Sequence, residues 1–118
     1  MKKYQLRGRY RDADFKGELE CSKNGELREI EFEDVTSGSF LRPTECSLTD
    51  LSAEVIDHMG ALMADEREGF EPARVVKGTW GQEPAYKVKG KSSSWYWEFE
   101  VTEAGRLLEL EKDARKGH

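Results

Sequence analysis

The chain is poor in the residues that build most catalytic and metal centres. Its 118 residues include two cysteines, two histidines and three prolines. Cys21 and Cys46 form neither a CxxC redox pair nor a zinc-ligand pattern, and we expect both to be reduced residues in or near the core. His118 is the last residue, which leaves His58 as one isolated imidazole. The parts for cysteine–histidine catalysis and for a transition-metal site are missing, so we expect no cofactor and no metal.

Long hydrophobic runs are also missing. Met1-Lys2-Lys3 is followed by Tyr4, Gln5 and Leu6 rather than by the apolar stretch of a secretory signal. No segment approaches the roughly 20 apolar residues of a membrane-spanning helix. Read from Met1, the sequence predicts a cytoplasmic protein without a membrane partner. If a leader was removed ahead of Met1, a secreted or periplasmic protein is expected instead.

The charge balance is acidic. Charged residues make up 36% of the chain and the net charge is −5. Nucleic acids are disfavoured as partners, because affinity for phosphate comes mainly from lysine and arginine. An acidic surface suits a basic protein partner, although many proteins are acidic for solubility alone. The length suits one domain, and we expect residues 1–118 to form it.

The aromatic and acidic residues of the stretch 95–111 alternate. Trp97, Phe99 and Val101 share one face of a predicted strand, whereas Tyr96, Glu98, Glu100 and Thr102 share the other. Gly105 suits a tight turn, since glycine accepts a positive φ. Pairing Thr102 with Leu107 places Leu108 and Leu110 on the apolar face and Leu107, Glu109 and Glu111 on the solvated one. The stretch therefore predicts a hairpin with one buried face and one acidic face.

A second hairpin is expected near the N-terminus. Asn24-Gly25 is a strong hairpin signal, and Leu19, Cys21, Ile30 and Phe32 fall on one face around it. The two regions resemble an internal repeat. Residues 4–8 match 86–90, residues 17–22 match 97–102, and residues 25–31 match 105–111. We interpret 4–34 as a partial first repeat and 47–113 as a helix plus the strands of the second.

One long helix is predicted between the two repeats. Ser47 and Asp50 form a capping pattern, and the helix is expected to end near Gly69 and Pro72. The apolar residues at helical spacing are Leu48, Leu51, Val55, Met59, Leu62 and Met63. Residues 35–46 are expected to form a connecting loop. The predicted fold class is α+β, with an antiparallel sheet of two related hairpin units and one long helix on one face.

The second half of the chain resembles the PepSY domain. The resemblance rests on the helix at 51–63, on Tyr86-Lys87-Val88, and on the hairpin 97–110 with glycine at its turn. The tandem arrangement is similar to that of the beta-lactamase inhibitor protein architecture. The resemblance implies a non-enzymatic domain, often tied to protease inhibition or regulation outside the cytoplasm.

Six residues are candidates for a binding site. Tyrosine and tryptophan are enriched at binding hot spots because they bury much area with few rotatable bonds. The aromatic candidates are Trp80, Trp95, Tyr96 and Tyr10, and the acidic ones are Glu98 and Glu100. The competing interpretation is that Trp80 and Trp95 cap the edge of the core and that the glutamates only solvate a sheet face.

Three function hypotheses follow. The leading one is a non-enzymatic protein-binding, inhibitory or regulatory module that uses an open, acidic, aromatic-bearing sheet face. The second is a small acidic immunity protein, antitoxin or phage-type inhibitor that presents carboxylates to a basic site. The third is a small enzyme in which Glu98, Glu100 or His58 acts as acid or base in a pocket between helix and sheet. We expect a monomer, or a homodimer formed through sheet edges.

Overall fold

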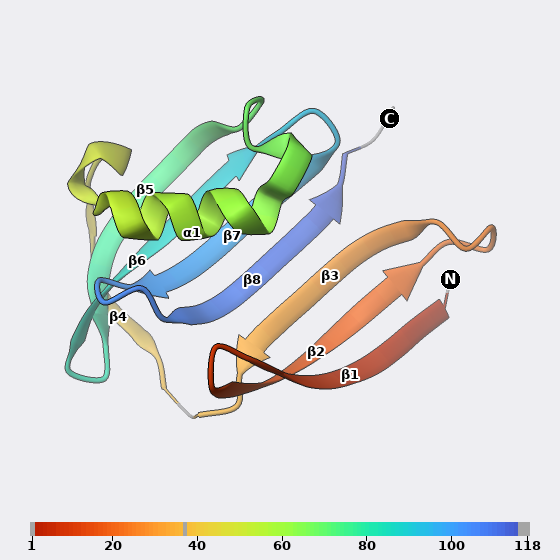
Figure 1. Cartoon of the computed structure of the whole chain (residues 1–118), viewed down its shortest axis with the longest axis horizontal. Coiled ribbons are helices and arrows are strands. Elements are labelled where there is room, and N and C mark those ends of the chain that lie inside the picture. Colours follow the sequence, from red (N-terminus) through yellow and green to blue (C-terminus); the bar gives the residue numbers. More distant parts are fainter. Residues whose placement is uncertain (1, 37, 116–118) are drawn as a thin grey trace.

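The computed structural model describes residues 2–36 and 38–115. Within these residues, eight strands form one antiparallel sheet in the order β1-β2-β3-β8-β7-β6-β5-β4, and one α-helix lies across one side of it (Figure 1). The expected antiparallel sheet with a helix on one face is therefore present, but the sheet is larger and the helix shorter than predicted. The strands are β1 (Lys2–Tyr10), β2 (Ala13–Cys21), β3 (Leu27–Asp34), β4 (Phe40–Glu45), β5 (Glu71–Trp80), β6 (Glu83–Lys91), β7 (Trp95–Thr102) and β8 (Leu107–Ala114).

The core lies between α1 (Ala53–Met63) and the strands β5 to β8. We call the side of the sheet that carries α1 the inner face and the opposite side the outer face. The predicted alternation of β7 is confirmed, because Trp97, Phe99 and Val101 are buried in the core. Burying each such side chain contributes roughly 1.5–3 kcal/mol. The apolar stripe predicted for the helix also packs into this core.

The predicted long helix is wrong. Ser47 does cap a helical turn, and Asp50 completes the capping box, but that turn is only the 3₁₀ segment Leu48–Asp50. The backbone is extended at Leu51, and Ser52 starts α1 afresh by accepting a hydrogen bond from the Val55 amide. The helix then ends at Ala64, whose φ is 51°. Two serine caps in succession thus divide one apolar stripe into two short pieces.

The expected loop at 35–46 is also wrong in part. Residues 40–45 form β4, which pairs with β5 and lies at the edge of the sheet. The pairing is interrupted between Leu41 and Thr44, around Arg42, whose φ is 57°, and Pro43. Proline is tolerated in a strand only at an edge or a bulge, and this segment is both. The proline and the short length concealed the strand in the sequence.

The turns of β2–β3 and β7–β8 have the same geometry. In one, the amide of Ser22 donates to the carbonyl of Glu26; in the other, the amide of Thr102 donates to the carbonyl of Arg106. The side-chain hydroxyls of Ser22 and Thr102 also accept a hydrogen bond, from the backbone amides of Glu26 and Arg106 respectively. Gly25 and Gly105 both have positive φ, 82° and 95°. The fourth turn residue is glycine in each because few other residues adopt that conformation.

A β-bulge follows at the same place in both hairpins. It falls between Glu20 and Cys21 in β2 and between Glu100 and Val101 in β7. The bulge shifts the register, so that Leu107 pairs with Val101 rather than with Thr102, and Leu107 is buried in the core. Phe99 still pairs with Leu110 as expected. The predicted placement of Leu107 on the solvated face is therefore wrong.

The two hairpins meet at the middle of the sheet. There, β3 pairs with β8 so that Glu31 lies directly opposite Glu111, its own counterpart in the repeat alignment. An approximate twofold axis thus passes through this pair and relates β3 to β8 and β2 to β7. Helix α1 breaks the relation, because it lies over the second half of the sheet and no helix of the described residues lies over β1 to β3 (Figure 1).

Candidate functional site

Carboxylates converge on the outer face of the sheet. Because residues paired across antiparallel strands share a face, the registers bring acidic side chains of four neighbouring strands together. These ten carboxylates, the acidic face, are Glu18 and Glu20 from β2, Glu29, Glu31 and Glu33 from β3, Glu109, Glu111 and Asp113 from β8, and Glu98 and Glu100 from β7. Like charges directly opposite each other destabilise a sheet, so this arrangement opposes folding.

Basic residues flank the acidic face but reach only its margins. Lys3 lies 3.6 Å from Glu18, Lys16 lies 3.9 Å from Glu33, and Lys89 lies 3.4 Å from Glu98. These ion pairs are largely exposed, and each is worth little. Among the described residues, no ion pair reaches Glu29, Glu31, Glu109 or Glu111 at the centre.

Burial, hydrogen bonds between carboxyls and mutual repulsion raise the pKa of the central carboxyls. A hydrogen bond with Glu100, burial and the charge of Glu100 together raise the pKa of Glu109 to about 9. Burial and the neighbouring Asp113 raise the pKa of Glu111 to about 7. Burial is also the main cause that raises the pKa of Glu29 and of Glu31. Part of the acidic face is consequently protonated at neutral pH, which lowers its charge.

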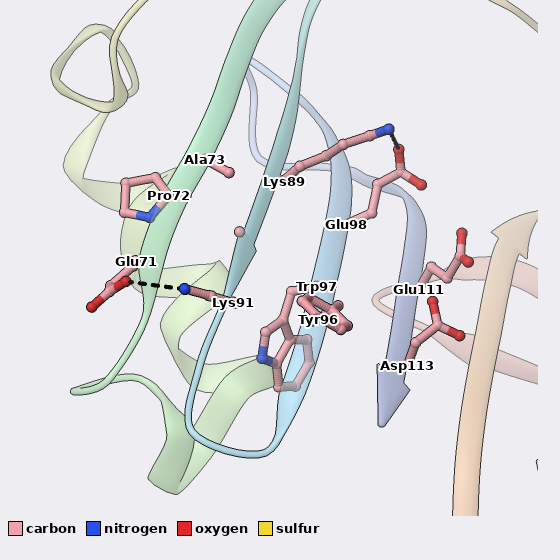
Figure 2. Close-up of a pocket in the computed structure, with 11 residues that line it drawn as sticks. Glu71, Pro72, Ala73, Lys89, Lys91, Tyr96, Trp97, Glu98, Glu111 and Asp113 are labelled. Atoms are coloured by element: carbon pink, nitrogen blue, oxygen red, sulfur yellow. Dashed lines mark ion pairs between the residues drawn. The ribbon is translucent and has the colours of Figure 1, made fainter. Parts of the chain in front are cut away.

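A shallow depression of about 470 Å³ lies beside the acidic face (Figure 2). One side of it is formed by Glu98, Glu111 and Asp113, and the other by Glu71 and Lys91, which form an ion pair. Tyr96 lines the depression and is 51% exposed. The depression therefore offers carboxylates, a lysine and an aromatic ring side by side.

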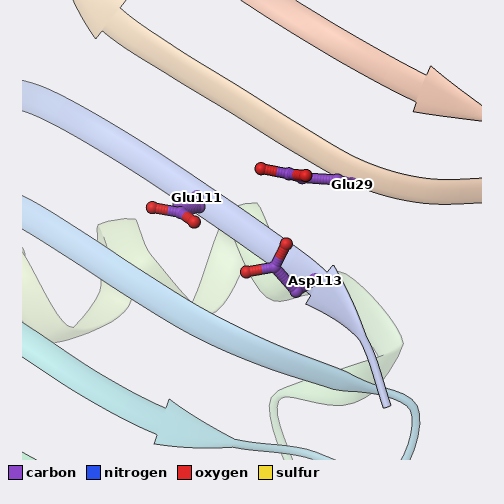
Figure 3. A group of neighbouring side chains, drawn as sticks. All are labelled: Glu29, Glu111 and Asp113. Carbon is purple, nitrogen blue, oxygen red and sulfur yellow. The ribbon is translucent and has the colours of Figure 1, made fainter. Parts of the chain in front are cut away.

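Two trios of carboxylates are close enough to share one cation. Glu29, Glu111 and Asp113 each place an oxygen within 4.8 Å of the other two, as do Glu98, Glu109 and Glu111 (Figure 3 shows the first trio). Oxygen ligands of this kind suit a hard divalent ion. Crowded carboxylates are common without an ion, however, and the expectation of no metal stays a prediction.

No family model, no curated protein and no solved structure matches the chain. The resemblance to the PepSY domain therefore stays a prediction. Among residues 2–36 and 38–115, no helix has both the length and the apolar character needed to cross a membrane.

The predicted acidic candidates both lie on the outer face, but only one is accessible. Glu98 is partly exposed and pairs with Lys89. Glu100 is 8% exposed, and its neighbour on the same face, Thr102, is 1% exposed. The expectation that this whole face is open to solvent is therefore wrong at Glu100 and Thr102, toward the end of β7.

The aromatic candidates are dispersed rather than gathered. Tyr96 is on the outer face, whereas Trp95 is partly buried against the core, with the Lys112 ammonium 4.1 Å from its ring centre. Trp80 is the last residue of β5, and the Arg106 guanidinium covers its ring at 5.0 Å. Tyr10 packs against the core, and its hydroxyl lies 2.7 Å from His58 Nε2. The structure thus brings only Tyr96, Glu98 and Glu100 together.

The trio of the enzyme hypothesis is not assembled. Glu98 and Glu100 point to the outer face, whereas His58 is buried on α1 at the inner face. His58 is held between Tyr10 and the carbonyl of Gly105, 3.1 Å from Nδ1, and burial lowers its pKa. With Tyr10 donating to Nε2 and Nδ1–H donating to Gly105, the neutral imidazole is fully satisfied. It joins α1 to two turns of the sheet.

Sequence reasoning missed part of the acidic face. The sequence predicts one solvated acidic face for the hairpin at 95–111, but it does not place Glu18, Glu20 or Asp113 beside that face. Each hairpin does show its own acidic alternation. What the sequence does not show is that β3 and β8 are neighbours, which is a long-range pairing between Asp113 and Glu29. Only the strand order merges two modest charge patterns into one.

Proposed function

We propose that the protein is a non-enzymatic binding module that docks a basic protein partner on the acidic face. The single observation that carries this proposal is the convergence of ten carboxylates on four adjacent strands, with cations reaching only the margin. Proteins break the rules of stable folding mainly at functional sites, and like charges paired across strands break one of them. A basic partner supplies the missing counter-charges.

The raised pKa values of Glu109 and Glu111 predict how partner binding depends on pH. A cation that approaches Glu109 and Glu111 favours their charged forms, so their pKa values fall on binding and protons are released. Binding is therefore expected to strengthen as the pH rises from 4.5 toward 9, the interval between the ordinary pKa of glutamate and that of Glu109. Tyr96, exposed beside the carboxylates, offers the apolar contact that charge alone does not provide.

An inhibitor or immunity-type role is the more specific version of the same proposal. An acidic protein that covers the basic substrate site of a nuclease or another toxin uses the same surface and the same chemistry. A toxin gene beside the gene for this protein favours this version over a general adaptor. The partner's basic site then explains why the carboxylates occupy one face.

A decalysine peptide is a suitable first probe of the acidic face. Calorimetry at low salt is expected to show binding that weakens with ionic strength, because exposed charges are screened by salt. The double substitution Glu31→Gln/Glu111→Gln neutralises the pair on the approximate twofold axis and should weaken binding about fivefold or more. The control Glu68→Gln/Glu103→Gln removes the same net charge from exposed sites outside the acidic face and should change little.

Partner capture extends the test to the native ligand. Immobilised protein is incubated with an extract of the source cells, and the retained proteins are compared between the wild type and the two double variants. Basic proteins should be retained by the wild type and the control but lost with Glu31→Gln/Glu111→Gln. Equal retention by all three proteins contradicts the proposal. If Ca²⁺ or Mg²⁺ stabilises the protein and also abolishes decalysine binding, the acidic face is a metal-binding site instead.

A further inference from the structure

Strand β1 lies at one edge of the sheet, where β2 is its one neighbour among the described strands (Figure 1). The pairing of β1 with β2 runs without a bulge over all nine residues, Lys2–Tyr10. The strand at the opposite edge, β4, is shorter, and its pairing is interrupted around Arg42 and Pro43. Prolines and bulges of that kind keep an edge from pairing with further strands. Of these two edges, β1 is therefore the one that offers a long, regular pairing surface.

Every second residue of β1 points its backbone groups away from β2. The β1–β2 turn consists of Arg11 and Asp12, which both have positive φ, 49° and 65°. A two-residue turn of this type joins the residues that flank it, Tyr10 and Ala13, by hydrogen bonds. Hydrogen-bonded and non-hydrogen-bonded pairs then alternate along an antiparallel ladder. The residues whose N–H and C=O groups point outward, the edge-facing residues, are Lys3, Gln5, Arg7 and Arg9.

Three of the four edge-facing residues are cations, and β1 contains no acidic residue. Their side chains lie on the outer face, because they alternate with Tyr10, which packs against the core at the inner face. Arg9 lies opposite Asp14 in β2, whereas Arg7 lies opposite Lys16, a like charge. Within residues 2–36 and 38–115, Arg7 forms no ion pair. The outer side of this edge therefore lacks counter-charge, which a strand added on its free side can supply.

Gly8 leaves a gap on the inner side of the same edge. It pairs with Phe15, whose side chain belongs to the core, so a side chain at position 8 would point to the inner face. Apart from its chain neighbours, no residue has a heavy atom within 4 Å of the place that a Cβ would occupy there. The gap adjoins a groove of about 390 Å³ that Leu6 and Tyr10 help to line. Glycine within a strand often marks the close approach of another backbone, and this groove has room for an apolar side chain of that strand.

We propose that β1 pairs with an extended acidic segment of a partner protein, which adds a ninth strand to the described sheet. Backbone hydrogen bonds supply affinity in such a complex, and alternate side chains supply specificity. Since residues paired across strands share a face, acidic side chains of the partner lie beside Lys3, Arg7 and Arg9 on the outer face. Apolar side chains alternate with them and lie beside Gly8 on the inner face. This edge is separate from the acidic face and takes a partner of opposite charge.

A second copy of the chain does not offer such a segment. Two β1 edges in antiparallel contact would bring their cations together, and like charges across paired strands are destabilising. The acidic strands β2, β3, β7 and β8 each already have a neighbour on both sides. The other edge strand, β4, is short and interrupted, and Glu45 is its one acidic residue. The acidic strand is therefore expected from a different protein.

The probe is a peptide of nine residues, the length of β1, in which glutamate alternates with valine. Amide hydrogen exchange of the full chain is measured by NMR with and without this peptide. Binding should slow exchange at the amides of the edge-facing residues about fivefold or more, with little change at the residues between them. This alternate pattern is specific to strand addition, because the intervening amides already point toward β2.

Two further peptides separate charge from backbone pairing. A peptide with lysine in place of glutamate should bind at least about tenfold more weakly, since it meets the cations of β1 with like charge. The glutamate peptide with N-methyl groups on alternate residues keeps its charge but loses the amide donors that face β1. It should also bind at least about tenfold more weakly.

A matched pair of variants tests the edge itself. Arg7→Glu places a carboxylate opposite Lys16, so the fold should be kept while binding of the glutamate peptide weakens about tenfold. Arg42→Glu makes the same charge reversal in β4, at the opposite edge, and should leave binding unchanged.

Three results would each overturn the proposal. The first is that the amides of the edge-facing residues are not protected up to millimolar glutamate peptide. The second is that the lysine peptide, the N-methylated peptide or the Arg7→Glu variant binds as well as the unmodified pair. The third is that the free protein is a dimer by light scattering with these amides already protected, which would assign the edge to a second copy.

Discussion

The two halves of the sheet share a hairpin design but differ in what covers them. The β2–β3 and β7–β8 turns have matching hydrogen bonds, matching glycines and a bulge at the same position. Yet α1 covers the second half, whereas on the same side of the first half Phe15 reaches the core and Leu19 and Ile30 are only partly buried. A hairpin geometry is therefore set locally, by turn residues and alternation, whereas burial depends on a segment that only one half has.

The halves also differ in how their turns are anchored. Arg106, in the second turn, donates to the carboxylate of Asp34 at 2.7 Å and covers Trp80. Its counterpart, Glu26, pairs with Arg28 at an exposed site. Burial raises the pKa of Asp34, but hydrogen bonds from Arg106 and Thr36 outweigh it and lower that pKa. The second turn is thus tied to two other elements, and the first is not.

Truncating equivalent side chains should reveal the largest difference in stability between the two halves. Phe99→Ala removes a fully buried ring and is expected to cost about 3–5 kcal/mol of unfolding free energy. Leu19→Ala, at the equivalent position, removes a partly exposed side chain and should cost about 1 kcal/mol. Urea unfolding followed by circular dichroism measures both. Equal losses would show that the first half is covered after all.

Breaking the turn anchor is expected to have the next largest effect. Arg106→Met leaves the carboxylate of Asp34, which is 9% exposed, without its cation and should cost about 2–3 kcal/mol. Glu26→Gln, the matched change in the first turn, should cost less than about 0.5 kcal/mol, because its ion pair is exposed. Thermal unfolding of the two variants compares them directly. A large effect of Glu26→Gln would remove the difference between the turns.

Neutralising one central carboxyl should stabilise the protein. The raised pKa of Glu109, about 9, means that its contribution to stability is present below pH 4.5 and is lost as the pH rises through 9. Glu109→Gln should therefore increase stability at pH 8 by about 1–2 kcal/mol, since its amide can donate to Glu100. Glu29→Gln, at the equivalent position in the first half, should have a smaller effect. Urea unfolding at pH 5 and pH 8 tests this, and a destabilised Glu109→Gln at pH 8 contradicts it.

The hydrogen bond between Tyr10 and His58 connects the two halves of the sheet. Its removal is expected to change the free energy of unfolding less than the changes above. Burial lowers the pKa of His58, so the folded state resists protonation and loses stability as the pH falls below 6.5, the value for the unfolded chain. Tyr10→Phe removes the hydrogen bond to Nε2 and should cost about 1 kcal/mol at pH 7.5. The pKa of His58 can be followed by NMR. A value above 6.5 in the wild type would contradict this account.

Local patterns predicted the hairpins, but pairings distant in sequence determined the rest. Alternation correctly assigned Trp97, Phe99 and Val101 to the core, since side-chain direction in a strand has a period of two. It failed at Leu107 because a bulge adds one residue to the count. The helix was overestimated because Ser52 starts a new cap within a continuous apolar stripe.

The acidic face illustrates the same limit. Glu31 and Glu111 each belong to a hairpin whose solvated side was predicted, yet their direct pairing depends on strand order. The crowding that buries Glu100 and raises the pKa of Glu109 likewise arises from neighbours far away in the chain. The sequence therefore indicated some of the residues of the acidic face but not their convergence.

Proton release is the sharpest measure of whether a basic ligand binds on the acidic face. Calorimetry of decalysine binding at pH 7, repeated in two buffers with different ionisation enthalpies, gives the number of protons released. We expect a net release, because a basic ligand lowers the pKa of Glu111, about 7, and of Glu109, about 9. The release should shrink in Glu109→Gln. Binding without proton release, or with proton uptake, would contradict a basic partner on the acidic face.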